Sequence, residues 1–237
     1  MKFFRGAAAL SLALMLAGTA CAGEIDVKVS TFSVYESKFG NYEAKIVTPI
    51  FTGLAIDDYQ RELNDSLMAR GRKTAAQYEA EVGEMMNDKM ADGGHLGVTL
   101  SYDVRVDNEK LLTVDLYELT IVGSSSTTHT FYNFDKKTGL PVELSSFFNG
   151  KADYVKIISD YIRGEMRRLN KKGEGPFWIA PQDSGGFSSI KPNQNFFVND
   201  KGNIVICFDK YEVAPGAAGS PEFEIPRRAV APWLKKN

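Results

Sequence analysis

Apolar and polar residues alternate along three parts of the N-terminal half of the chain. The alternation covers residues 25–30 and 42–47, and it returns over residues 96–134. Asp107–Glu109 and Ser124–Ser126 interrupt the third part and have the composition of turns. A period of two is typical of a strand with one buried face. The pattern therefore predicts an antiparallel pair of strands followed by a meander of three long strands.

Two other stretches carry apolar residues at every third or fourth position, which is the spacing of an amphipathic helix. The longer stretch runs from Ile56 to Met90 and has Gly71 near its middle. Because glycine disfavours the helix interior, we expect a bend at Gly71 or two consecutive helices. The shorter stretch runs to about Asn170, and Asp153 can cap its start.

Short strands and irregular segments share the last third of the chain. Strands are predicted at Phe196–Val198, Ile204–Phe208 and Phe223–Ile225. Ile204–Phe208 is apolar on both faces and therefore belongs inside a sheet. Residues 171–189 are rich in Gly and Ser, and the tail after Arg227 is expected to be loosely ordered. The order of elements predicts an α+β protein, with helices packed on one side of a largely antiparallel sheet.

The first 22 residues have the pattern of a secretory signal peptide. Two basic residues precede an apolar run from Ala7 to Ala17, and Ala20–Ala22 matches a cleavage site. The run is too short for a transmembrane span. We therefore expect an exported protein that is periplasmic or associated with the cell envelope. Gly18–Cys21 also resembles a lipobox, in which Cys21 would carry a lipid anchor to the membrane.

Composition narrows the range of partners. The 237 residues have a formal net charge of −2, and this mild acidity argues against nucleic acid as a partner. It is weakly compatible with a cationic partner. With Cys21 removed or lipidated, Cys207 is the one remaining thiol, and its apolar strand indicates a buried core residue.

The common catalytic and metal-binding patterns are missing from the sequence. The two histidines, His95 and His129, have no metal-ligand spacing, and there is no G-x-S-x-G motif. We therefore predict no metal, no cofactor and no catalytic residue. His129 lies on a predicted strand and is expected to be a partly buried, hydrogen-bonded residue. Five carboxylates on the meander are expected on its solvated face: Asp103, Asp107, Glu109, Asp115 and Glu118.

Four residues are candidates for ligand binding. Phe177 and Trp178 lie in the irregular segment, where aromatic side chains either anchor a loop to the core or contact a partner. Tyr211 and Glu212 leave the buried strand at the start of a loop. Pro215 and the small residues after it explain that loop by close packing alone, so a structural role and a ligand-facing role both stay open.

Two segments carry a resemblance to a known family. They are FDKYEVAPGAAGSPEFEIP, from Phe208 to Pro226, and YNFDKKTGLPVELSSFF, from Tyr132 to Phe148. Both resemble extracytoplasmic domains found in the lysozyme-sensing anti-sigma factor RsiV and in the non-catalytic N-terminal part of the peptidoglycan deacetylase PdaC. The family usually has an aromatic residue after the proline of its loop, where this chain has Gly216.

The resemblance implies a division of the chain into two α+β subdomains. Residues 126–237 resemble the RsiV-like domain. Residues 23–125 resemble the PdaC-like companion domain in their strand–helix–strand order. The boundary would fall within the second turn of the predicted meander.

The function that the resemblance implies is a non-enzymatic binding module of the cell envelope. Its ligand would be a protein, lysozyme-like or another envelope protein, or peptidoglycan. Two alternatives stay open: an enzyme acting on envelope carbohydrate or an accessory domain of one, and a structural lipoprotein.

Overall fold

The computed structural model describes residues 25–87, 94–183 and 185–236. The predicted signal peptide, Cys21 and the predicted helix end at Met90 lie outside these residues. The chain is an α+β protein with two mostly antiparallel sheets, as the patterns predicted.

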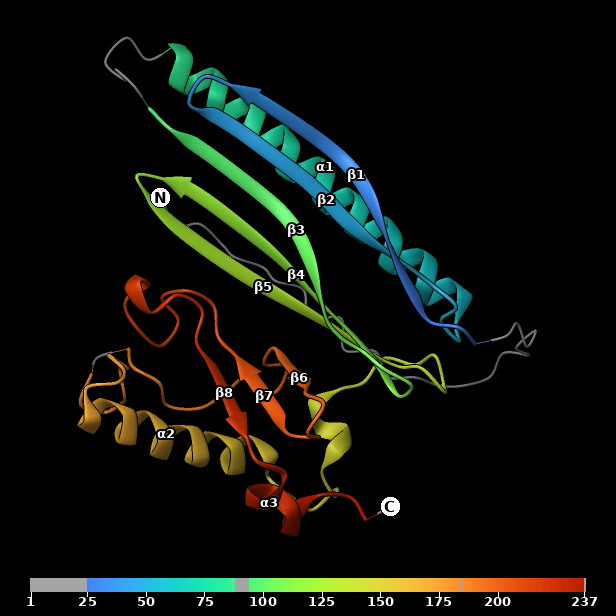
Figure 1. Ribbon diagram of the computed structural model, residues 1–237, viewed down its shortest axis with the longest axis vertical. Helices are drawn as coiled ribbons and strands as arrows, with labels where there is room; N and C mark the ends of the chain where they lie inside the picture. The colour runs from blue at the N-terminus through green and yellow to red at the C-terminus, as the bar shows by residue number, and fades with distance from the viewer. Residues whose placement is uncertain (1–24, 88–93, 184, 237) are drawn as a thin grey trace.

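The N-terminal sheet has five strands in sequence order (Figure 1). They are β1 (Lys28–Phe39), β2 (Tyr42–Thr52), β3 (Leu96–Asp107), β4 (Leu111–Val122) and β5 (Ser124–Asp135). All neighbours are antiparallel except β2 and β3, which are parallel. A parallel pair needs a crossover connection, and the helix α1 (Asp57–Asn87) supplies it.

Helix α1 is continuous through Gly71, so the expectation of two consecutive helices there is wrong. Gly71 is buried against the sheet, where an added Cβ would lie 2.8 Å from Val34 and 3.1 Å from Thr48. Because Gly71 has no side chain, the helix can pack closely against strands β1 and β2. The apolar face of α1 packs against Ile46, Leu100 and other large side chains that share one face of the sheet.

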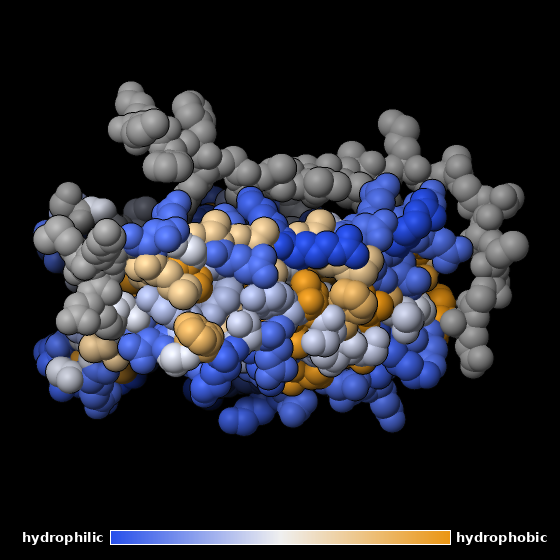
Figure 2. Space-filling model, turned by 90° about the horizontal axis from the view of Figure 1, so that it is seen from above, coloured by the Kyte–Doolittle hydropathy of each residue, from blue (hydrophilic) through white to orange (hydrophobic). Residues whose placement is uncertain are grey.

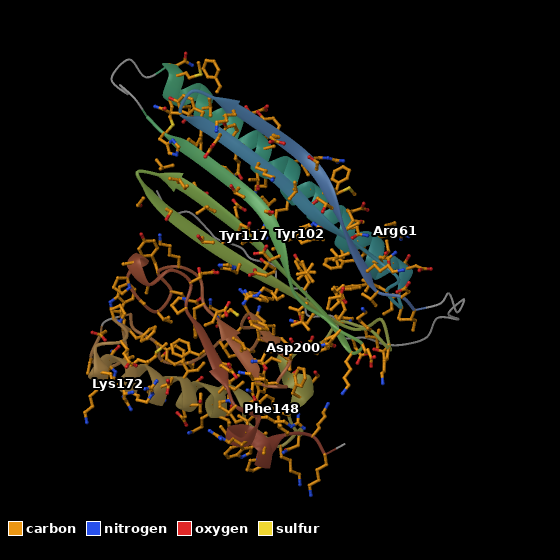
Figure 3. The ribbon with its side chains drawn as sticks, viewed as in Figure 1. Arg61, Tyr102, Tyr117, Phe148, Lys172 and Asp200 are labelled. Atoms are coloured by element: carbon orange, nitrogen blue, oxygen red, sulfur yellow. The ribbon has the colours of Figure 1, made fainter. Side chains whose placement is uncertain are left out.

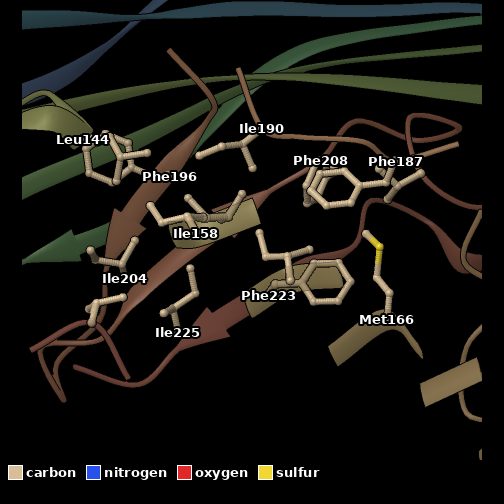
Figure 4. Packing of buried hydrophobic residues seen from close by; sticks show 14 of the residues in the cluster. Leu144, Ile158, Met166, Phe187, Ile190, Phe196, Ile204, Phe208, Phe223 and Ile225 are labelled. Carbon is tan, nitrogen blue, oxygen red and sulfur yellow. The ribbon is translucent and has the colours of Figure 1, made fainter. Parts of the chain in front are cut away.

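The C-terminal sheet has three short strands: β6 (Phe196–Val198), β7 (Ile204–Cys207) and β8 (Glu222–Ile225). One face packs against the helix α2 (Tyr154–Lys172), and Ile158, Ile162 and Met166 of the helix are buried there. Figure 4 shows Ile158 and Met166 in this core. Asp153 caps α2 as predicted, because its carboxylate accepts a hydrogen bond from the amide of Lys156 at 3.0 Å. Short helical turns complete this half: η1 (Leu144–Phe147), η2 (Gly216–Ala218), α3 (Arg227–Val230) and η3 (Ala231–Trp233).

The two sheets face each other with their helix-free sides. A small cluster joins them, in which Val106 and Phe131 of the large sheet meet Phe197, Val205 and Cys207 of the small one. Side chains fill the space between the two sheets (Figure 3). The layers therefore run helix, sheet, sheet, helix. A division between residues 125 and 126 falls inside β5, which completes the large sheet.

Two local expectations are wrong. The turn between β4 and β5 is at Gly123, which has a φ of 67°, so Ser124–Ser126 already belong to β5. The tail after Arg227 forms α3 and η3, and it is held by the buried side chain of Val230.

Apolar side chains also reach the surface. On the face shown in Figure 2 they lie between hydrophilic ones. Three of the large exposed apolar residues lie on or next to β1: Ile25, Phe32 and Phe39.

Candidate functional site

An open cleft of about 470 Å³ lies on the surface of the C-terminal half. Its described lining residues come from the irregular segment before β6 and the loop after β7: Trp178, Gln182, Asp183, Gly185, Tyr211 and Glu212. Three of the four predicted binding residues, Trp178, Tyr211 and Glu212, are therefore brought to one cleft.

Backbone hydrogen bonds fix the wall that carries Trp178. The Trp178 amide donates to the carbonyl of Val213 at 2.9 Å, and the Trp178 carbonyl accepts from the amide of Phe187 at 2.8 Å. The segment 171–189 is irregular in sequence, but here it is tied to the loop after β7. Asp183 closes the turn that follows Trp178, because its carboxylate accepts a hydrogen bond from the amide of Ile179 at 2.7 Å.

Tyr211 owes its position to Gly216. A Cβ added at Gly216 would lie 2.3 Å from the Tyr211 ring, so the ring occupies the space that a side chain at position 216 would need. Tyr211 also has a φ of 69°, a backbone conformation that is costly for a residue with a side chain. Tyr211 is 46% exposed, and Lys210 Nζ lies 5.2 Å from the centre of its ring.

Glu212 is ion-paired as well as cleft-lining. One oxygen of its carboxylate accepts from Lys191 Nζ at 2.8 Å, and the other accepts from the amide of Asp209 at 2.9 Å. Glu212 and Asp183 thus place two carboxylates beside two aromatic rings. This combination suits a cationic group, which the carboxylates attract and the ring faces accommodate.

Phe177 takes the anchoring role that the sequence left open. Its ring is half-buried and lies 5.1 Å from the Phe223 ring, measured between centroids. Asn170 at the end of α2 hydrogen-bonds both the amide and the carbonyl of Phe177. Phe177 therefore holds the loop to the core and does not line the cleft.

A second polar group of residues lies between the two sheets. Asp115 of β4 is only 2% exposed, so its expected place on a solvated face is wrong. Its carboxylate oxygens lie 3.0 and 3.1 Å from His129 Nδ1, and one of them lies 3.3 Å from Arg105 Nη1. On the other side of the imidazole, His129 Nε2 lies 3.0 Å from Ser220 Oγ.

Arg105 extends this polar group to β8. Its guanidinium donates to the Glu222 carboxylate at 2.6 Å and lies 4.6 Å from the centre of the Phe197 ring. Burial alone would lower the pKa of Arg105, but Glu222 and Asp115 raise it above its ordinary value. Arg105 is therefore charged and balances the buried carboxylate.

The imidazole responds to the same charges. Burial by itself would lower the pKa of His129, but the hydrogen bond that its Nδ1–H donates to Asp115 and the negative charges of Asp115 and Asp209 raise it above its usual value. His129 is partly buried and hydrogen-bonded, as expected from its strand.

Asp209 links the buried polar group to the cleft. Its carboxylate accepts from the amide of His129 at 2.7 Å, while its own amide donates to Glu212. Burial raises the pKa of Asp209, although the hydrogen bond from His129 opposes the shift.

The sequence carries no local signal for the buried polar group, because its members lie up to 117 residues apart. Alternation along β4 and β5 identified two faces correctly. It did not show that the second face meets another sheet instead of solvent. Of the other meander carboxylates, Asp103, Asp107 and Glu109 are exposed as expected, whereas Glu118 is partly buried and lies 3.3 Å from Arg70 of α1.

Other chemistry is limited in the described part of the chain. Cys207 is buried, and desolvation raises the pKa of its thiol far above the ordinary value, which suppresses the reactive thiolate. Over the described ranges, no group of three or more His, Cys, Asp or Glu side chains could hold a metal ion. No helix within those ranges is long and apolar enough to cross a bilayer.

Comparison with protein families confirms the predicted resemblance. Residues 145–228 match the family described as protein of unknown function (DUF3298). The matched region begins in η1 and ends in α3, and it includes both the α2–sheet core and the cleft. Over 209 residues the chain is 28% identical to the anti-sigma-V factor RsiV of Bacillus subtilis, which covers 88% of this chain and 71% of that protein.

Solved structures share the fold. A DUF3298 family member from Bacteroides fragilis has a TM-score of 0.62 at 17% identity, over 89% of this chain and 94% of that one. A DUF3298 family protein from Pseudomonas aeruginosa has a TM-score of 0.53 at 13% identity, over 89% and 93% of the two chains. The architecture of both halves is therefore common to proteins whose sequences have diverged widely.

Proposed function

We propose that this chain, which carries a DUF3298 domain over residues 145–228, is an exported cell-envelope module that binds a basic protein through the cleft at Trp178, Tyr211 and Glu212. The observation that carries the proposal is the pairing of two aromatic rings with two carboxylates in one open site. A relative named as an anti-sigma factor supports a protein as the partner.

Recognition suits this cleft better than turnover. A carbohydrate-cleaving enzyme needs one carboxyl group held protonated beside a second, ionised one. Here Glu212 is ion-paired with Lys191, and Asp183 accepts a backbone hydrogen bond. Both carboxylates therefore act as hydrogen-bond acceptors in the structure, which is the role that an ammonium or guanidinium group of a ligand requires.

The partner that fits best is a lysozyme-like or other basic envelope protein. Basic side chains would enter between the Trp178 and Tyr211 rings and meet the carboxylates, where cation–π contacts and charge-assisted hydrogen bonds act together. Peptidoglycan is the competing ligand, because sugar rings also stack on aromatic side chains.

Binding to lysozyme and to purified peptidoglycan, measured by calorimetry and by sedimentation, tests the proposal. Trp178→Ala should weaken lysozyme binding by at least about tenfold, since aromatic anchors carry much of the energy of an interface. Glu174→Gln, an exposed acidic residue outside the cleft lining, is the matched control and should bind like the wild type. The proposal fails if the wild-type protein binds neither ligand, or if Trp178→Ala binds lysozyme as tightly as the control does.

Export is part of the proposal and has its own test. Intact-mass analysis of the mature protein should show a chain that begins at Gly23 if a signal peptidase cleaves after Ala22. A chain that begins at Cys21 and carries added lipid mass would establish the membrane anchor. An unprocessed N-terminus would overturn export.

A further inference from the structure

Three side chains from separate elements form a line between the sheets. Asp115 lies on β4, His129 lies on β5, and Ser220 lies in the loop before β8. The Asp115 carboxylate is 3.0 Å from His129 Nδ1, and His129 Nε2 is 3.0 Å from Ser220 Oγ. An acid, an imidazole and a hydroxyl in this order are the parts of an activated serine nucleophile.

We propose that Ser220 is a nucleophile, activated by His129 and oriented through it by Asp115, which takes the acyl group of a carboxylic ester. This site is separate from the cleft, since none of the three residues is among its lining. It adds a covalent chemistry to the proposed binding function and does not depend on it.

The carboxylate is well suited to its role. Asp115 is 2% exposed, and its contact with Arg105 holds the carboxylate in place beside the imidazole. When His129 is neutral, its Nδ1–H donates to Asp115, so Nε2 is left with a lone pair aimed at the Ser220 hydroxyl. Each nitrogen therefore has the partner that a general base requires.

The loop leaves Ser220 partly exposed to solvent. Ser220 is half-buried, unlike Asp115. The preceding Gly219 has a φ of 68° and a ψ of −140°, a conformation essentially restricted to glycine. On the other side, the carbonyl of Pro221 accepts a hydrogen bond from the amide of Phe208 at 3.0 Å, which ties the loop to the end of β7.

The reaction balances without an added oxidant or metal. Ser220 Oγ forms a bond to the ester carbonyl carbon, and its proton passes to His129 Nε2. The ester C–O bond then breaks, and the leaving alcohol takes that proton from His129. Water, activated by the same imidazole, hydrolyses the acyl-serine to release the acid and restore the hydroxyl.

The groups around the imidazole favour this chemistry once His129 is neutral. Asp115 and Asp209 place negative charge near the ring, Arg105 opposes them, and the rings of Tyr117 and Phe131 lie 6.4 and 6.3 Å from it. Because the pKa of His129 is raised, its base form becomes dominant at a higher pH than it does for an ordinary histidine. Reactivity of Ser220 should therefore increase with pH and then level off.

A fluorophosphonate probe tests the proposal, because it phosphonylates activated serines irreversibly and needs no envelope partner. With the full-length mature chain we expect one adduct, mapped by peptide mass spectrometry to Ser220. Ser220→Ala should abolish it, and His129→Gln should slow it by about 10²- to 10⁴-fold, the usual contribution of a general base. Ser126→Ala, an exposed serine on β5, should label at the wild-type rate.

A purely structural hydrogen bond would give different results. Labelling that does not reach Ser220, that is equally fast in His129→Gln, or that does not change with pH would overturn the proposal. Circular dichroism of each variant checks folding. Asp115→Asn provides a second test of the proposal. If Asp115 positions His129, this variant should label more slowly, and the midpoint of its labelling rate against pH should move to a lower pH. Hydrolysis of p-nitrophenyl acetate should show a burst equal to the protein concentration in the wild type and no burst in Ser220→Ala.

Discussion

Arg105 is the residue whose loss should most clearly expose how the two sheets are joined. Its guanidinium contacts the Asp115 carboxylate at 3.3 Å and the Glu222 carboxylate at 2.6 Å, and it packs 4.6 Å from the Phe197 ring centre. Arg105→Met keeps an apolar stem against the rings but removes the charge. Asp115, whose side chain is 3% exposed, then retains His129 alone as a charged partner.

The expected magnitude follows from that burial. Removing one partner of a fully buried ion pair costs about 3–5 kcal/mol, because the other charge is left uncompensated. The Arg105 side chain is 26% exposed, and His129 still bonds Asp115, so solvent and the imidazole reduce the penalty. We expect the free energy of unfolding to fall by about 2–3 kcal/mol.

Urea denaturation followed by circular dichroism measures this loss. Arg168→Met is the matched control, since Arg168 forms an ion pair with Glu165 on the exposed side of α2 and should leave the unfolding midpoint nearly unchanged. A second readout is specific to the buried group. Arg105 opposes protonation of His129, so its removal should raise the pKa of His129 further in an NMR titration.

Two outcomes would refute the reasoning. Arg105→Met and Arg168→Met could shift the unfolding midpoint equally, in which case the inter-sheet charges contribute no more than a surface pair. Alternatively, the pKa of His129 could stay unchanged in Arg105→Met, which would show that Arg105 does not act on the imidazole. If the double variant Arg105→Met/Asp115→Asn is more stable than Arg105→Met alone, the uncompensated charge of Asp115 is confirmed as the cause of the lost stability.

Three further outcomes are expected. The pKa of His129 is raised in the folded state, so its protonation stabilises the fold fully below the ordinary pKa near 6.5, and this contribution is lost as the pH rises through the folded-state value. The difference in free energy of unfolding between wild type and His129→Gln should therefore shrink from pH 6 to pH 9. A difference that does not change with pH would contradict the assignment. Gly216→Ala should displace the Tyr211 ring and weaken ligand binding at the cleft, while Ala217→Ser at the exposed neighbouring position should not. Ile162→Ala on the buried face of α2 should lower the free energy of unfolding by about 2–5 kcal/mol in urea denaturation, and a loss below about 1 kcal/mol would contradict the burial of Ile162 in the core.

Most of the secondary structure could be predicted because each strand and helix has a period that matches its burial. The alternation along β3 and β4 and the apolar face of α2 each predicted the right kind of element, although β4 is buried on both faces from Leu112 to Leu116. Errors arose where a residue serves a contact distant in sequence. Gly71 has the local signature of a helix breaker, but it lies beside Val34 and Thr48 and permits close packing.

The candidate sites show the same division. Trp178, Tyr211 and Glu212 could be proposed from sequence because aromatic and charged residues in loops need an explanation. Their meeting in one cleft depends on the hydrogen bonds between the Trp178 segment and Val213, which no local pattern specifies.

The sequence by itself determined the α+β class, the strands and helices, the capped start of α2 and the resemblance to a known family, because these depend on periodicity and on short motifs. Only the tertiary structure decided that the second face of β4 and β5 meets another sheet. That contact converts Asp115 from an expected surface carboxylate into a buried one, and it brings His129 within hydrogen-bonding distance of Ser220, 91 residues away along the chain. Burial and long-range proximity are properties of the packed layers, and neither is encoded by the alternation of a single strand.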